Sequence, residues 1–180
     1  MRIKRELSLG LILDIQEKLF PHMDQYEVLL KRCAILIEGL KVLDIPLLLT
    51  EQYPKGLGAT VPEISVLYAQ KPVIEKIAFS CCDEPALMQH AFLQSRNTVI
   101  ICGIEAHVCV LQTAIDLLEA GYQVVVVEDC ISSRKPEDKR VAVERMRTEG
   151  AVISTSESIL LELARVAGTE EFKTISRLIK

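Results

Sequence analysis

The feature that most constrains the fold of this chain is an alternation of short apolar runs with longer amphipathic stretches. The runs are continuously apolar, which is typical of strands that are covered on both faces. The stretches between them are long enough for helices, and a helix between two parallel strands makes a right-handed crossover. The pattern therefore predicts a three-layer α/β/α sandwich with a mostly parallel, Rossmann-like sheet of about five to six strands.

Apolar runs, helical spacing and the turn residues between them give the bounds of the expected elements. Strands are expected at residues 7–13, 46–50, 72–77, 98–102, 122–127 and 151–153. Helices are expected at residues 25–43, 84–94, 107–120, 136–149, 156–166 and 170–179. No repeat or linker-like segment divides the 180 residues, so a single domain over residues 1–180 is expected.

Charge and hydropathy narrow the class of partner. The net charge is −4 and no strong basic patch occurs, which argues against nucleic acid as a partner. No apolar stretch reaches the ~20 residues that cross a bilayer, so no membrane association is expected. The run at residues 7–13 is short for a signal peptide, and no small-residue cleavage site follows it. We therefore expect a soluble, cytoplasmic protein.

The six cysteines are expected to be free thiols, because several of them lie inside apolar segments of a chain without a signal peptide. No Cys-x-x-Cys occurs, and the three histidines (His22, His90 and His107) are scattered among different segments. A metal site is therefore not expected, and no cofactor is expected either.

In an open parallel sheet the ligand site lies beyond the carboxyl ends of the strands, near the switch in strand order. Three residues fall at such places: Asp14, Lys76 and Cys109. Asp14 follows a buried strand, where a carboxylate needs a partner; an N-cap or a structural ion pair is the other interpretation. Lys76 lies late in an apolar strand, and its other interpretation is an edge lysine that discourages aggregation.

Cys109 follows a strand and a glycine turn, and it is expected in the first turn of a helix. The positive end of the helix dipole and the exposed backbone N–H groups there lower a thiol's pKa and can hold an oxyanion. The other interpretation is a small buried hydrophobic residue, which suits Cys33, Cys102 and Cys130 better. Asp, Lys and Cys in this order at consecutive strand ends favour a reactive site.

The sequence resembles the isochorismatase-like cysteine hydrolases through essentially its whole length. The resemblance is carried by residues 14–16 (DIQ), Lys76 with Phe79 and Ser80, residues 102–109 (CGIEAHVC), and Gly121 and Tyr122 leading into residues 124–129. Residues 50–58 (TEQYPKGLG) and 154–157 (STSE) are similar to the branch of isochorismatase-domain-containing proteins.

This resemblance implies a role for each matching residue. Cys109 would attack a carbonyl carbon and form a thioester, and Asp14 would take the thiol proton. Lys76 would hold a positive charge beside this pair. The Ile104–Glu105 peptide bond would be cis, and the backbone N–H groups of Glu105 and Cys109 would bind the oxyanion.

A small-molecule substrate, a homo-oligomer and a metal-free site are also implied by the resemblance. Residues of the possible pocket are Gln16, Phe20, Glu51, Tyr53, Ile104 and His107. Glu51 lies at the pocket mouth or is a solvated loop acid, and His107 is assigned to the pocket rim or to packing rather than to catalysis. The metal-binding nicotinamidases carry Asp-x-His after the second strand, whereas residues 50–53 here are TEQY, so nicotinamidase activity is in doubt.

Two further hypotheses remain beside a hydrolase of a small amide or related acyl compound. One is a non-catalytic oligomeric binding or scaffold protein that keeps the fold. The other is a nucleotide-binding α/β protein, which the absence of Gly-x-Gly-x-x-Gly and of a P-loop disfavours.

Overall fold

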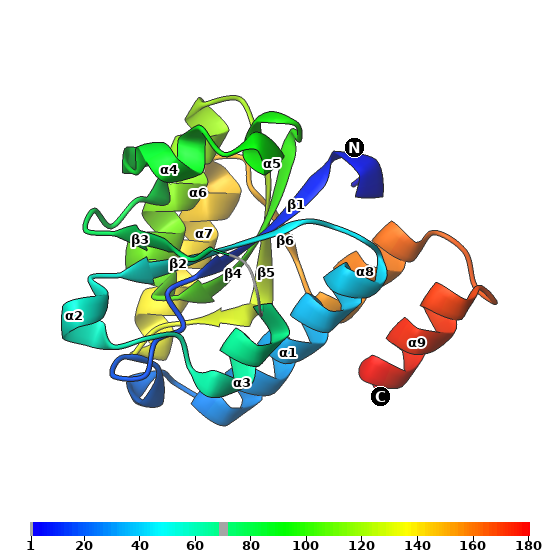
Figure 1. Ribbon diagram of the computed structural model, residues 1–180, viewed down its shortest axis with the longest axis horizontal. Coiled ribbons are helices and arrows are strands. Elements are labelled where there is room, and N and C mark those ends of the chain that lie inside the picture. The colour runs from blue at the N-terminus through cyan, green and yellow to red at the C-terminus, as the bar shows by residue number, and fades with distance from the viewer. Residues whose placement is uncertain (1, 69–71) are drawn as a thin grey trace.

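The computed structural model describes residues 2–68 and 72–180, and a sheet of six parallel strands forms its centre (Figure 1). The strands are β1 Ser8–Leu13, β2 Leu47–Gln52, β3 Ile74–Lys76, β4 Thr98–Ile104, β5 Gln123–Ser132 and β6 Val152–Ser154. Their order across the sheet is β3-β2-β1-β4-β5-β6, and each neighbouring pair is parallel. The predicted α/β fold with a parallel sheet is therefore confirmed.

Helices cover both faces of this sheet, which completes the three layers (Figure 1). The helices are α1 Tyr26–Val42, α2 Pro54–Leu57, α3 Pro62–Ser65, α4 Pro85–Met88, α5 Ala91–Gln94, α6 Leu111–Glu119, α7 Pro136–Thr148, α8 Ser156–Ala164 and α9 Glu170–Leu178. One apolar core packs α1, α8 and α9 against one face of the sheet. A second apolar core packs α4, α5, α6 and α7 against the other face. Because side chains alternate along a strand, β4 supplies Ile100 to the first core and Ile101 to the second.

Several elements differ from the sequence expectation, and three of the differences have a clear local form. The helix expected at residues 84–94 is two short helices, because His90 has an extended backbone and its ring Nδ1 accepts the Phe92 N–H at 3.2 Å, which starts a new helix. The strand expected at residues 72–77 is shortened to β3. Conversely, β5 runs on to Ser132, because Ile131 and Ser132 pair with the end of β4 beyond an irregularity in register.

The switch in strand order lies between β1 and β4, and Gly103 makes the close approach of these strands possible. Gly103 has φ of +128°, and a Cβ atom there would lie 2.1 Å from the backbone oxygen of Leu13. Only glycine fits at this position. The segments that leave β1 and β4 therefore start side by side, one carrying Asp14 and the other Glu105 to Cys109.

Candidate active site

Asp14 follows the last residue of β1 and is held in an unusual backbone conformation. Its φ is +53°, in the left-handed region that aspartate tolerates better than most residues. Its N–H donates to the Thr50 carbonyl at 3.2 Å, and its own carbonyl accepts the Gln16 N–H at 2.8 Å. The side chain is fully buried, so this carboxylate points into the protein at the switch point.

Lys76, the last residue of β3, neutralises this buried carboxylate. Its Nζ lies 2.7 Å from Asp14 Oδ2, and both side chains are 0% exposed. Burial is the largest single effect and lowers the pKa of Lys76, but the charge of Asp14, the neighbouring Cys81 and Cys109 and the contact with the Asp14 carboxylate together outweigh it, and the net shift is upward. Lys76 is therefore a buried cation with a partner and does not guard an exposed strand edge.

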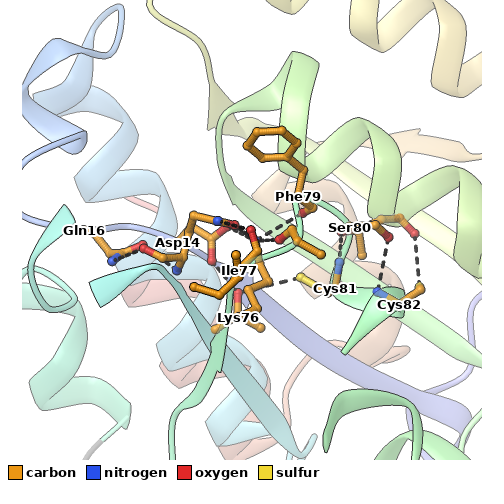
Figure 2. Close-up of polar contacts among 12 residues, drawn as sticks. Asp14, Gln16, Lys76, Ile77, Phe79, Ser80, Cys81 and Cys82 are labelled. Atoms are coloured by element: carbon orange, nitrogen blue, oxygen red, sulfur yellow. Dashed lines mark hydrogen bonds and ion pairs between the residues drawn. The ribbon is translucent and has the colours of Figure 1, made fainter. Parts of the chain in front are cut away.

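The segment after β3 wraps around the Lys76 ammonium (Figure 2). The ammonium donates to Gln52 Oε1 at 2.6 Å and to the carbonyl oxygens of Ala78 and Phe79 at 3.2 and 3.1 Å. The side chains of this segment project the other way: Ile77 is 71% exposed and Phe79 is 55% exposed. The segment therefore turns its carbonyl groups inward and its apolar side chains outward.

Polar contacts with α6 hold the far end of this segment. Ser80 Oγ donates to Asp116 Oδ2 and also accepts the Cys82 N–H at 3.2 Å. The Cys81 N–H donates to Thr113 Oγ1 at 3.0 Å. Asp116 and Thr113 both belong to α6, so the carbonyl groups that bind Lys76 are fixed to the helix that follows Cys109.

Cys109 lies beside the Asp14–Lys76 pair, in a π-helical turn over Ala106–Val110 that precedes α6. The residue is only 6% exposed. Burial raises the pKa of the Cys109 thiol, the charge of Asp14 raises it further and Lys76 lowers it, which leaves a pKa of about 12. The expectation of a lowered pKa is therefore wrong for this resting site, because burial and the nearby carboxylate outweigh the lysine. At neutral pH the thiol carries its proton.

The other five cysteines are also free thiols, in different surroundings. Cys33, Cys102 and Cys130 are buried in the core between the sheet and α1, where Cys33 Sγ donates to the Cys130 carbonyl at 3.3 Å. Cys81 is fully buried, and burial raises its pKa to about 12. Cys82 is only partly buried, and burial raises its pKa to about 11.

Glu105 stands between β4 and the π-helical turn, and the Ile104–Glu105 peptide bond is cis. No hydrogen bond among the described residues uses the Glu105 N–H as donor. The Glu105 carboxylate accepts Arg134 Nε–H at 3.0 Å. His107 Nδ1 lies 2.9 Å from Ser133 Oγ and 4.0 Å from Glu105 Oε2. His107 therefore belongs to a polar cluster that links the turn to the end of β5.

Of the remaining pocket candidates, two hold loops in place through hydrogen bonds and two lie in the apolar core. Gln16 is buried and braces the end of β2, because its Nε2 donates to the Gln52 and Gly58 carbonyls and its Oε1 accepts the Gln52 N–H. Glu51 Oε1 accepts the Thr60 N–H and hydroxyl, both at 2.7 Å, so Glu51 is a loop anchor rather than a solvated acid. The structure places Phe20 and Ile104 in the core with α1.

Tyr53, the last pocket candidate, lies just beyond β2 and is half exposed. Its N–H donates to the Lys76 carbonyl at 2.8 Å, and its ring lies against Gly56. Tyr53 is therefore tied to the backbone of Lys76, while its ring covers the short helix α2.

Sequence reasoning assigned no role to Thr50 or Gln52. Thr50 Oγ1 donates to Asp14 Oδ1 at 2.7 Å, and Gln52 Oε1 accepts a hydrogen bond from Lys76 Nζ at 2.6 Å. Both residues are buried. The available signal was their position at the end of an apolar strand next to β1, where uncharged polar side chains need partners.

The described residues contain no group of three or more His, Cys, Asp or Glu side chains placed to hold a metal ion. In the same part of the chain, no helix has the length and apolar character needed to span a bilayer.

The fold and the site first define a class: an open parallel α/β protein with a buried acid, a buried lysine and a thiol gathered at its switch point. The Isochorismatase domain model matches residues 8–158, and the chain therefore belongs to the isochorismatase family. It is 43% identical to isochorismatase domain-containing protein 2A of Mus musculus over 180 residues, which cover 99% of this chain and 85% of that protein.

Two solved structures extend the comparison. The MAR1 ribonuclease of Caenorhabditis elegans is 39% identical, with a TM-score of 0.92 over 99% of this chain and 92% of that chain. The YcaC gene product of Escherichia coli, described as an octameric hydrolase of unknown specificity, has a TM-score of 0.92 at 22% identity, over 98% and 90% of the two chains. At 22% identity, the comparison with the E. coli protein shows similarity of the fold alone.

Proposed function

We propose that this protein is a cysteine-dependent hydrolase of a small amide or a related acyl compound, in which Asp14, Lys76 and Cys109 form the catalytic triad. The observation that carries the proposal is the buried ion pair between Asp14 and Lys76 beside a buried thiol. A charge pair without exposure to solvent is costly to maintain, and such pairs gather where chemistry requires them.

The first half of the reaction follows from the contacts of Asp14 and Cys109. Because the thiol is protonated at rest, Asp14 Oδ2 accepts its proton as sulfur attacks the carbonyl carbon. Lys76 keeps the site's charge balanced during this transfer. The N–H groups of Glu105 and Cys109 bind the developing oxyanion. The carbon–nitrogen bond then breaks, and the proton on Asp14 passes to the departing amine, which leaves a thioester on Cys109.

Water completes the cycle. Asp14 takes a proton from the water molecule as its oxygen attacks the thioester carbon, and the carbon–sulfur bond breaks. The sulfur leaves as thiolate and recovers the proton from Asp14. No step requires a metal or a redox partner, because the same carboxylate serves as base and acid in each half.

The experiment that tests the proposal is activity profiling on a panel of small amides and esters, with Cys109→Ala as the control. An acyl adduct on Cys109, detected by mass spectrometry after a rapid acid quench, would identify the thioester. The panel includes a single-stranded RNA, because the C. elegans relative is described as a ribonuclease. RNA cleavage that depends on Cys109 would replace the small-amide assignment. Labelling of Cys109 without turnover of any substrate would favour the scaffold alternative.

We also propose that the chain forms a homo-oligomer through the segment around Lys76. The exposed apolar side chains of Ile77 and Phe79 belong to this segment, and the half-exposed Tyr53 is bonded to the Lys76 backbone beside it. Exposed apolar patches mark interaction surfaces. The octameric state given for the E. coli YcaC protein supports self-association of this fold. Light scattering after size-exclusion chromatography measures the subunit number, and an Ile77→Asp/Phe79→Asp variant is expected to reduce it.

For the location of the protein we propose the cytoplasm, because a reducing compartment keeps six free thiols reduced. Fractionation of the native host followed by detection with an antibody is the test, and recovery from the medium would overturn the assignment.

A further inference from the structure

The two carboxylate oxygens of Asp14 have different surroundings, although both are buried. Oδ1 accepts a hydrogen bond from the Thr50 hydroxyl at 2.7 Å. Oδ2 lies 2.7 Å from Lys76 Nζ, and Cys109 also interacts with this carboxylate. One oxygen is therefore held by a neutral donor, and the other faces the ammonium.

The reason for this asymmetry lies in the hydrogen bonds of Lys76. An ammonium has three N–H donors, and the three acceptors at Gln52, Ala78 and Phe79 are all within hydrogen-bond distance. The ammonium is thus shared between the Asp14 carboxylate and three neutral acceptors, so it supplies charge to Oδ2 without occupying both of its lone pairs. A base that is charge-stabilised and still has a free lone pair is suited to accept a proton from a neighbouring thiol.

Thr50 is the residue that decides which oxygen faces the ammonium. It holds Asp14 twice, through its backbone carbonyl and through its hydroxyl. The hydroxyl in turn accepts a long contact of 3.8 Å from Cys81 Sγ. Its strand partner in β1 is Leu13, so the pairing of β1 with β2 sets its position next to Asp14. Figure 2 shows Asp14, Lys76 and Cys81 among the residues of this site.

We propose that Thr50 is a positioning residue for the proposed reaction, which orients the Asp14 carboxylate so that Oδ2 accepts the proton of Cys109. The inference rests on the proposed function, because it assigns Asp14 the role of base. The titratable groups around this carboxylate are Lys76 from β3, Cys109 from the π-helical turn and Cys81 from the turn after Ser80. Thr50 itself has no charge, so its removal changes the geometry and the hydrogen bonding without changing the charge of the site.

The test measures alkylation of Cys109 by acrylamide between pH 5 and pH 9, read by peptide mass spectrometry, and needs no knowledge of the substrate. Thr50→Val keeps the shape and removes the hydroxyl. Its rate at pH 7.5 is expected to fall roughly tenfold, the range for a lost hydrogen bond to a charged group. Because the hydroxyl donates to the carboxylate, its loss should also move the acid side of the rate profile to higher pH.

Two control sets separate positioning from folding. Thr50→Ser and Thr50→Ala differ from each other by the hydroxyl alone, so the serine variant should label within about twofold of the parent and the alanine variant should behave like valine. Thr98→Val removes a buried threonine hydroxyl at the opposite end of the sheet. It controls for loss of stability, which would lower the melting temperature without moving the pH profile.

Asp14→Asn distinguishes failure of this inference from failure of the proposed function. If Asp14→Asn slows the labelling of Cys109 and Thr50→Val leaves rate and profile unchanged, the role of Thr50 is overturned and that of Asp14 stands. If Asp14→Asn labels like the parent, Asp14 is not the base and both proposals fall. A shifted profile in Thr50→Val and Thr50→Ala, absent from Thr50→Ser, supports the inference.

Discussion

A comparison of two buried thiol sites, the cluster of Cys33, Cys102 and Cys130 and the single Cys109, separates the effect of burial on a thiol's pKa from the effect of its charged neighbours. Cys33, Cys102 and Cys130 pack together between α1 and the sheet, where their polar neighbours are thiols, a carbonyl group and, for Cys130, the Asp129 carboxylate at 3.8 Å. Cys109 is buried almost as well, but it lies against an ion pair. A hydrogen bond with Cys33 and burial raise the pKa of Cys102, and burial raises the pKa of Cys130 and of Cys109, so none of these three thiols rests as a thiolate. The difference lies in the neighbours: the carboxylate beside Cys130 is the partly exposed Asp129, whereas Cys109 lies against Asp14 and Lys76, a carboxylate and an ammonium that are both fully buried.

The largest expected effect comes from removing the thiol of Cys109. Cys109→Ala is expected to lower any amide hydrolysis by at least about 1,000-fold, because the nucleophile is lost. Hydrolysis measured by release of the amine provides the test. A variant that keeps most of the parent's activity would move the chemistry away from Cys109.

Asp14→Asn removes the proposed base and keeps the backbone, because asparagine also tolerates the left-handed conformation. We expect the rate of hydrolysis to fall by about 100- to 1,000-fold, the usual share of a general base. Asp44 is a matched control, because it is a second aspartate with positive φ and lies on the surface. Asp44→Asn should leave the rate within about twofold of the parent; an equal loss in both variants would point to the backbone rather than to proton transfer.

Lys76→Met tests the ion pair through stability. It leaves Asp14 as an unpaired charge in a fully buried place, and breaking a buried pair in this way costs about 3–5 kcal/mol. Urea denaturation followed by circular dichroism measures the loss. The double variant Asp14→Asn/Lys76→Met should recover most of that loss, because no unpaired charge remains. No recovery would mean that Lys76 acts mainly through its hydrogen bonds to the segment after β3.

High pH should destabilise the protein through its buried thiols. The pKa of Cys109 and that of Cys81 are each raised from 9.0 to about 12, so both thiols bind their protons more tightly in the folded chain. Their contribution to stability is complete below pH 9 and is lost as the pH rises towards 12. The free energy of unfolding should therefore fall between pH 8 and pH 10.5, by about 2 kcal/mol for each thiol.

The measurement is urea denaturation at several pH values in parent, Cys109→Ala and Cys81→Ala. Each variant should show a shallower fall than the parent, because it has one thiol fewer to deprotonate. Equal slopes in all three would show that these thiols do not govern the high-pH behaviour.

The smallest effect belongs to the cluster of Cys33, Cys102 and Cys130. Cys102→Ala removes one buried sulfur from the core and should cost about 1 kcal/mol of stability while activity stays unchanged. Loss of activity at unchanged stability would show that a change in the cluster of Cys33, Cys102 and Cys130 alters the site at Cys109. Thermal unfolding and amide hydrolysis on the same sample check both statements.

The sequence was sufficient to predict the fold and the three residues that meet at the switch point. Continuous apolar strands specify a parallel sheet, and a parallel sheet brings the residues after β1, at the end of β3 and after β4 to one edge. Asp14 and Lys76 could be singled out in the sequence because a charged side chain inside or beside a buried apolar strand is costly unless it has a partner.

Other features of the site depend on three-dimensional detail. Thr50 and Gln52 matter through uncharged hydrogen bonds that depend on the register between neighbouring strands. The protonation state of Cys109 was mispredicted, because the balance between burial, Asp14 and Lys76 depends on depth and not on sequence position. The break at His90 arises from one bond between a ring nitrogen and the backbone, a local competitor of the helix.

The cluster of Cys33, Cys102 and Cys130 gives the protein a built-in probe of its own local opening. These thiols are contributed by α1, β4 and β5, and none reaches solvent while the elements stay packed. A small alkylating reagent can modify each of them only during an opening that exposes it, so three modification rates report how often three parts of one core come apart. A native-state stability map of this sheet is therefore accessible by mass spectrometry from the cysteines already present.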